Sequence, residues 1–121
     1  MDLDNPVIQL CIQGTQAEFA RRMEDARSLY QQAWKLAKDD YEACIAAHYM
    51  ARFAETPEEG LGWNQKALDC ATRVKDERVK EFYPSLFLNM GHSYEQLGRP
   101  DEARRYYDLA AQLGAVHSTQ F

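Results

Sequence analysis

The chain has 121 residues, of which 45% are hydrophobic and 12% aromatic, and its formal net charge is −5. This length predicts one domain, 1–121, and this apolar content excludes a disordered chain. The acidic balance argues against a nucleic-acid partner, which needs a basic surface on the protein. No apolar run is long enough to span a membrane.

The cellular setting is predicted from the start of the chain and from the cysteines. The first residues lack the basic and then apolar pattern of a secretory signal. Cys11, Cys44 and Cys70 are widely spaced and form neither a CxxC pair nor a disulfide framework. We therefore expect a reducing, cytoplasmic location.

Prolines and glycines mark the predicted helix ends in chain order. Asn5-Pro6 predicts a helix start, with an N-cap followed by proline in the first turn. Thr56-Pro57-Glu58-Glu59 predicts another start, with the spacing of a capping box. Gly98-Arg99-Pro100-Asp101 predicts a stop followed at once by a start. Between these marks apolar residues recur every three or four positions, as in Tyr41, Cys44, Ile45, His48, Tyr49 and Phe53. The pattern predicts six helices and no strand.

The chain also repeats itself. Residues 7–40 align with residues 41–74, and a third unit spans 84–117. Small residues recur at the eighth and twentieth places of the units, as Gly14, Ala26, Gly60, Gly91 and Ala103. A short side chain at such places lets the two helices of a hairpin lie close together.

The third unit carries the clearest family signal. Its small and aromatic residues, Phe87, Met90, Gly91, Tyr94, Ala103, Tyr107 and Ala110, resemble the tetratricopeptide repeat. The resemblance implies an all-α fold, a right-handed superhelical stack of three antiparallel helical hairpins (an α-solenoid). The second unit departs most, with His48 for the usual glycine and Asn64 for the usual aromatic residue. We interpret His48 and Gly60 as a volume-conserving exchange across the helix crossing.

A charged extension, residues 75–83, separates the second and third units. Val79 and Tyr83 continue the apolar stripe of the following helix backwards, which favours one long helix from Asp76 to Leu97 with a kink near Pro84. The alternative is that the preceding helix extends to Phe82 and the chain turns at Pro84.

The resemblance implies a concave groove lined by the first helix of each unit and filled by a peptide or helix of another protein. Tyr49 and Arg52 are the expected anchors. The predicted groove residues are Ile8, Thr15, Ile45, Tyr49, Arg52, Leu88, Asn89 and His92. Family members that capture chaperone C-termini use a clamp of lysine, arginine and asparagine, but the equivalent places here are Cys11, Thr15, Ala46, Ser85 and Asn89. With no cation among them, we expect no binding of that kind.

The expected function is therefore a protein–protein interaction module, an adaptor or scaffold for a partner of unknown identity. The alternative is a self-associating protein. Leu109 and Leu113 should leave an apolar side at the C-terminal end, which either the tail, residues 114–121, or a second copy in a homodimer would cover. Cys44 and His48 have the spacing of half a metal site but occupy core places of the repeat. No phosphate-binding glycine loop is present. We expect no catalytic, cofactor-binding or metal-binding residue, and no enzyme.

Overall fold

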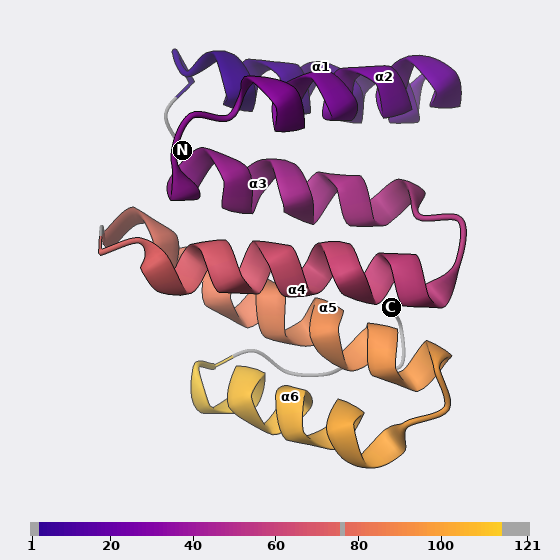
Figure 1. The fold of residues 1–121 in the computed structure, drawn as a ribbon, viewed down its shortest axis with the longest axis vertical. Helices are drawn as coiled ribbons and strands as arrows, with labels where there is room; N and C mark the ends of the chain where they lie inside the picture. Colours follow the sequence, from indigo (N-terminus) through magenta and orange to yellow (C-terminus); the bar gives the residue numbers. More distant parts are fainter. Residues whose placement is uncertain (1–2, 76, 115–121) are drawn as a thin grey trace.

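The computed structural model describes residues 3–75 and 77–114, and this part of the chain is helical with no strand. Six α-helices follow one another in a stack from α1 and α2 at one end to α6 at the other (Figure 1). The α-helices are α1 Pro6–Phe19, α2 Met23–Leu36, α3 Asp40–Met50, α4 Pro57–Arg73, α5 Tyr83–Gln96 and α6 Pro100–Gln112. Two 3-10 segments, Ala51–Phe53 and Glu77–Phe82, continue α3 and precede α5.

Local hydrogen bonds explain where two of the helices begin. The Asn5 side chain accepts hydrogen bonds from the backbone N–H groups of Val7 and Ile8, so α1 starts where the sequence predicts. Thr56 accepts from the N–H of Glu59 and caps α4 in the same way. The Glu59 carboxylate reaches back to the N–H of Glu55 rather than to that of Thr56, a one-residue departure from the predicted capping box.

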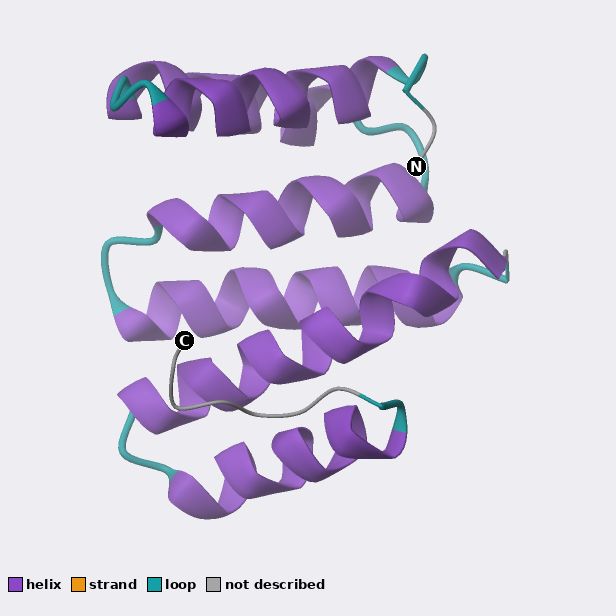
Figure 2. Ribbon diagram, turned by 180° about the vertical axis from the view of Figure 1, so that it is seen from behind, coloured by secondary structure: helices purple, strands orange, loops and turns teal. Residues whose placement is uncertain are grey.

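The helices pack as consecutive antiparallel hairpins, α1 with α2, α3 with α4, and α5 with α6. The hairpins meet where α2 packs on α3 and where α4 packs on α5. Seen from behind, the same order of helices runs from one end of the molecule to the other (Figure 2). In this layering α3 and α5 lie on either side of α4 along the stack.

The extension before the third hairpin differs from both sequence-based alternatives. Helix α4 ends at Arg73, and Glu77–Phe82 forms a 3-10 segment that runs directly into α5. The segment therefore joins the following helix, as the preferred alternative has it, but with the tighter 3-10 geometry. Val79 anchors it in the core with 2% exposure. Pro84 lies in the first turn of α5, where a missing N–H is tolerated. The predicted N-cap, Asp76, lies outside the described residues.

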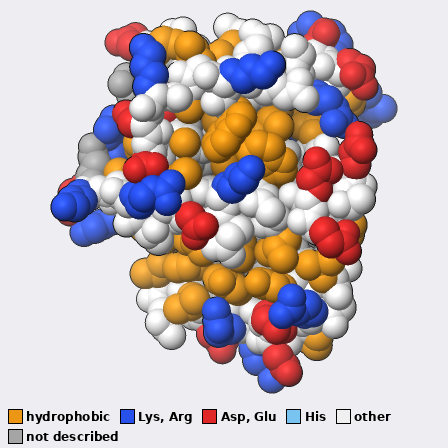
Figure 3. All heavy atoms as spheres, viewed as in Figure 1, with side chains coloured by type: hydrophobic (Ala, Val, Ile, Leu, Met, Phe, Trp, Pro, Cys, Tyr) orange, Lys and Arg blue, Asp and Glu red, His pale blue; other side chains and the backbone are white. Residues whose placement is uncertain are grey.

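Hydrophobic side chains fill the hairpins and the junctions between them. One core cluster is centred on α1, α2 and α3, and a second on α4, α5 and α6. Trp34 and Trp63 join the two clusters through an edge-to-face contact with ring centroids 5.0 Å apart. On the face seen in Figure 1, hydrophobic side chains gather in two areas with a charged and polar band between them (Figure 3).

Candidate functional site

The junction between the first and second hairpins is filled by an aromatic ring. Tyr30 of α2 is completely buried, and its ring lies against Gly14 of α1. On its other side the ring stacks on Tyr49, with centroids 5.0 Å apart, and contacts Phe53 at 5.6 Å. The Tyr30 hydroxyl donates to Glu18 Oε1 at 2.5 Å. The glycine of the repeat thus makes room for a tyrosine ring as well as for a neighbouring helix.

The second hairpin lacks this ring. Asn64 stands at the place of Tyr30, and His48 at the place of Gly14. The buried Asn64 amide donates to Ser93 Oγ at 2.8 Å and approaches the backbone oxygen of Asn89 at 3.5 Å. A shorter, polar side chain therefore replaces the aromatic filling at the junction between the second and third hairpins.

The predicted volume exchange between His48 and Gly60 is wrong. A Cβ added at Gly60 would meet only the Ala54 Cβ, at 3.6 Å, so the histidine does not fill the space beside that glycine. His48 turns instead toward α5, where the Asn89 side-chain nitrogen lies 3.0 Å from Nδ1. An amide nitrogen can only donate, so Nδ1 accepts and the neutral ring carries its proton on Nε2.

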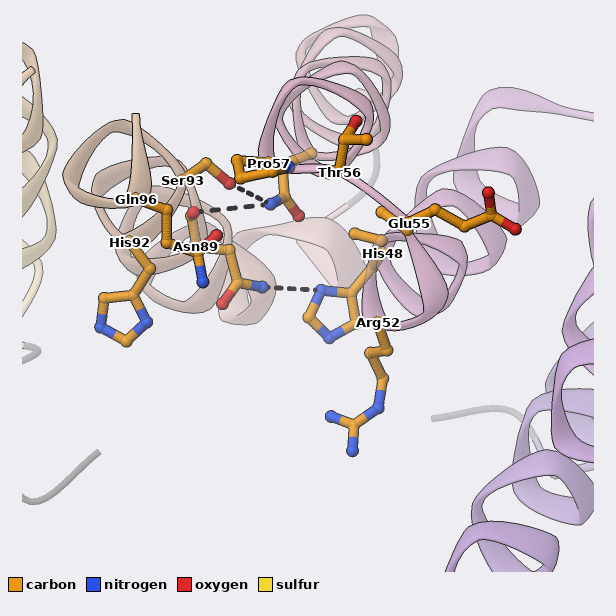
Figure 4. A pocket seen from close by; sticks show the side chains of 13 residues that line it. His48, Arg52, Glu55, Thr56, Pro57, Asn89, His92, Ser93 and Gln96 are labelled. Atoms are coloured by element: carbon orange, nitrogen blue, oxygen red, sulfur yellow. Dashed lines mark hydrogen bonds between the residues drawn. The ribbon is translucent and has the colours of Figure 1, made fainter. Parts of the chain in front are cut away.

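These substitutions leave a cavity of about 710 Å³ between α3, the start of α4, and α5. His48 and Asn89 point toward one another across it, and His92 and Arg52 extend along its open side (Figure 4). We call it the junction cavity. Its lining residues are His48, Ala51, Arg52, Ala54, Glu55, Thr56, Pro57, Gly60, Asn64, Asn89, His92, Ser93 and Gln96.

The junction cavity presents mainly neutral hydrogen-bonding groups. Arg52 is held by Glu18, with Nε to Oε1 at 2.9 Å and Nη2 to Oε2 at 2.7 Å, and this pairing lowers the pKa of the Glu18 carboxyl. Burial, assisted by the positive charge of Arg52, lowers the pKa of His48 below 6.5, so the imidazole is neutral at neutral pH. The positive charge of the one arginine in the lining is therefore already compensated.

A second, smaller cavity of about 90 Å³ adjoins the first and shares His48 with it. Apolar and aromatic side chains dominate its lining. The lining residues are Cys44, Ile45, His48, Tyr49, Phe82, Ser85 and Leu86. Burial raises the pKa of the Cys44 thiol to about 12, so this sulfur is a core atom rather than a nucleophile.

The predicted groove residues fall into three groups. Arg52, Asn89 and His92 line the junction cavity, and Ile45 and Tyr49 line the smaller one. Leu88 is half-buried and lines neither, and the Thr15 hydroxyl is hydrogen-bonded to the Cys11 carbonyl. Ile8 has no exposed surface and belongs to the core between α1 and α3, so the prediction that it contacts a partner is wrong.

Sequence reasoning missed six polar or charged residues of the junction cavity, namely His48, Glu55, Thr56, Asn64, Ser93 and Gln96. The signal was present, because His48 and Asn64 are the two positions at which the second unit departs most from the repeat pattern. At the C-terminal end, Leu113 is 53% exposed, whereas Leu109 is half-buried against the core. The rest of the tail, residues 115–121, lies outside the described residues.

Metal-binding clusters and membrane-spanning helices are both absent from the described residues 3–75 and 77–114. No cluster of three or more histidine, cysteine, aspartate or glutamate side chains there is arranged to hold a metal ion. No helix in that part of the chain has the length and apolar character needed to cross a bilayer.

Comparison with known proteins identifies the repeat. Residues 84–114 match the model of the family described as tetratricopeptide repeat. This match covers α5 and α6, the hairpin whose small and aromatic residues carry the clearest resemblance. No match to the chain was found among curated proteins or among solved structures. The family recognition and the all-α helical repeat fold predicted from the sequence are confirmed.

Proposed function

The chain is a tetratricopeptide-repeat protein, and from this premise we propose that it is an adaptor or scaffold that holds a peptide or helix of another protein and performs no catalysis. Tetratricopeptide repeats generally act as protein–protein interaction modules. The observation that supports the proposal is the junction cavity, because its walls come from two successive hairpins: the end of α3 with its 3-10 continuation and the start of α4 in the second, and α5 in the third. Concave, polar-edged sites of this size are where proteins hold ligand groups.

The charges of the site favour a neutral partner segment. Arg52 is paired with Glu18, and Glu55 adds a negative charge to the rim. A terminal carboxylate placed there would lose its hydration without gaining a free cation. We therefore expect the partner to present an internal, uncharged segment rather than its C-terminus.

A site-specific photo-crosslinker tests this proposal. Placed at Gln96, on the rim of the junction cavity, it should join the chain to a defined partner protein. Placed at the exposed Arg105, on the last helix and away from the cavity, it should not. Asn89→Ala should reduce the crosslink at 96, because Asn89 projects into the cavity. Equal crosslinking at both sites, or none at either, would refute the proposal that the junction cavity holds a partner protein.

Tyr49 and Arg52 are poor positions for this test, although the sequence marks them as anchors. Tyr49 stacks on the buried Tyr30 ring, and Arg52 ties the second hairpin to Glu18 in the first. Replacing both would weaken the stack itself, so lost binding would not separate a contact role from a folding role. Gln96 and Asn89 avoid this difficulty better.

A second candidate function is self-association, which one exposed aromatic residue favours. Phe19 is 86% exposed and occupies the place in the first hairpin that Phe53 occupies in the second. Phe53 packs on Tyr30 and lies under Arg27, whose guanidinium carbon is 5.6 Å from the ring centroid. Arg104 and Tyr107 stand at the corresponding places of the third hairpin. A second copy would thus extend the stack by seating its Phe19 there.

This stacking ranks second because it opposes like charges. Within the chain, Arg52 of the second hairpin pairs with Glu18 of the first. If the added copy stacked in the same register, its Glu18 would take the place of Arg52 and would face Glu95 of the third hairpin, so two negative charges would meet. Light scattering at increasing concentration tests the idea. Growth in mass that Phe19→Ser removes would support self-association, and a constant monomer mass would refute it.

A further inference from the structure

The two hairpin junctions differ at three matched places. At the first, Tyr30 stacks on Tyr49 and Phe53. The matched residues at the second junction are Asn64, His92 and Gln96, all of which line the junction cavity. Three aromatic rings are thus replaced by two amides and one imidazole. The cavity, at about 710 Å³, is larger than a single ring, and it opens where the first junction holds the rings of Tyr30, Tyr49 and Phe53.

The chain cannot easily fill this space with a ring of its own. A Cβ at Gly14 would lie 2.3 Å from the Tyr30 ring, so a tyrosine at this place requires glycine opposite. His48 stands opposite Asn64, and its ring is held by Asn89. The third hairpin again has the pairing of glycine with tyrosine, in Gly91 and Tyr107. The second hairpin has neither the glycine nor the tyrosine, which is what an open site at the second junction requires.

The lining selects among possible ligand groups. A carboxylate would meet Glu55 on the rim and an arginine already paired with Glu18. A purely apolar ring would displace water from the amides of Asn89 and Gln96 without replacing its hydrogen bonds. A phenol satisfies both requirements, because its faces pack on planar neutral groups and its hydroxyl both donates and accepts.

We propose that the junction cavity binds a tyrosine side chain presented by an extended segment of a partner protein, with the phenol ring lying beside His92 and Gln96, which stand at the places of Tyr49 and Phe53. This inference rests on the proposed function of a protein-binding groove. It adds the identity of the residue that the groove recognises, and it makes the second hairpin the specificity-determining one.

Capped pentapeptides test the choice of side chain directly. Acetyl-Gly-Gly-Xaa-Gly-Gly-amide, with tyrosine, phenylalanine, aspartate or alanine as Xaa, is titrated into the ¹⁵N-labelled protein. The tyrosine peptide should shift the side-chain amide signals of Asn64, Asn89 and Gln96 saturably. The phenylalanine peptide should bind about tenfold more weakly, since it lacks one hydrogen-bonding group. Equal or tighter binding of the phenylalanine or aspartate peptide, or no shift with tyrosine, would overturn the inference.

A ring-restoring variant supplies the blocking control. His48→Gly with Asn64→Tyr recreates the pairing of Gly14 with Tyr30, so it should fold and no longer respond to the tyrosine peptide at Gln96. Gly62→Ala, on the same helix as Asn64, is the matched control that keeps full binding, because an added Cβ there meets nothing within 4 Å. If the double variant does not fold, Gly60→Leu obstructs the same cavity from α4.

The two proposals fail in different ways. A partner crosslinked at position 96 equally well in the wild type and in the ring-restoring variant would leave the adaptor standing and refute recognition of tyrosine. A tyrosine peptide that binds the ring-restoring variant as tightly as the wild type would refute the inference in the same way. Absence of any crosslinked partner counts against the proposed function, whatever the peptides do.

Discussion

Replacing Gly14 with alanine tests how tightly the first junction is packed. The new Cβ would lie 2.3 Å from Tyr30 Cε1, whereas ordinary contact begins at 3.4 Å, so the ring must retreat by about 1 Å. It has little room to do so. Tyr30 has no exposed surface, stacks on Tyr49, and donates a hydrogen bond to Glu18. The ring is therefore unlike the loose end of a flexible side chain, which would move at little cost.

The expected magnitude follows from two opposing terms. Alanine is favoured over glycine within a helix by about 1 kcal/mol. Overpacking of a filled core costs about 1–3 kcal/mol, and loss of the buried ring from its place would cost more. We expect Gly14→Ala to lower the free energy of unfolding by up to about 2 kcal/mol, and to lower the melting temperature by about 4 °C per kcal/mol. Urea unfolding followed by far-UV circular dichroism measures this change.

Two other glycines serve as comparisons. An added Cβ at Gly62 meets nothing within 4 Å, so Gly62→Ala should raise stability by up to about 1 kcal/mol. At Gly91 the Cβ would lie 2.5 Å from Tyr107, but that ring is partly exposed and ends the described stack, so its retreat should cost less than that of Tyr30. The expected order of stability is Gly62→Ala, then Gly91→Ala, then Gly14→Ala. A Gly14→Ala protein as stable as Gly62→Ala would show that the Tyr30 ring is not held in place.

Three further outcomes are expected. Burial and the charge of Arg52 lower the pKa of His48 in the folded state below 6.5, so the unfolded chain takes up the proton first. The free energy of unfolding should therefore fall as the pH decreases below about 6.5. Urea titrations at several pH values measure this slope, and His48→Asn should remove it. Burial raises the pKa of Cys11 and of Cys44 to about 12, so both thiols should resist Ellman's reagent in the folded protein and react when urea unfolds it. Asn5→Ala removes the acceptor that caps α1 and should cost about 1–2 kcal/mol in urea unfolding, whereas no loss would show that the cap is dispensable.

The sequence predicted best those features that depend on neighbouring residues. Asn5 and Thr56 cap helices through bonds to backbone groups two or three positions away, so the sequence alone contains both partners. The family signature of the third unit is similarly compact, and residues 84–114 match the family model. Helix type, helix starts and the repeat class follow from such short-range information.

Prediction failed where a distant helix decides the outcome. Ile8 is predicted to line the open groove, yet packing of α1 against α3 removes all of its surface. The segment Glu77–Phe82 has an apolar spacing that suits an α-helix, but it forms a 3-10 segment where α4 ends and α5 begins. The spacing of apolar residues in this segment does not determine whether its backbone forms an α-helix or a 3-10 helix.

The second hairpin shows how a mismatch with a repeat pattern should be weighed. From the sequence alone, the large His48 is interpreted as filling the space left by the small Gly60 where the two helices of the hairpin cross, because volume-conserving exchanges are tolerated in cores. The residue that decides the matter is a third one, Asn64, which has lost the ring that needs a glycine opposite. Its amide is satisfied by Ser93, so the polar replacement is stable although it fills less space. A repeat position that exchanges a buried ring for a satisfied amide keeps the fold and opens a cavity, and such positions are where a helical repeat can gain a binding site.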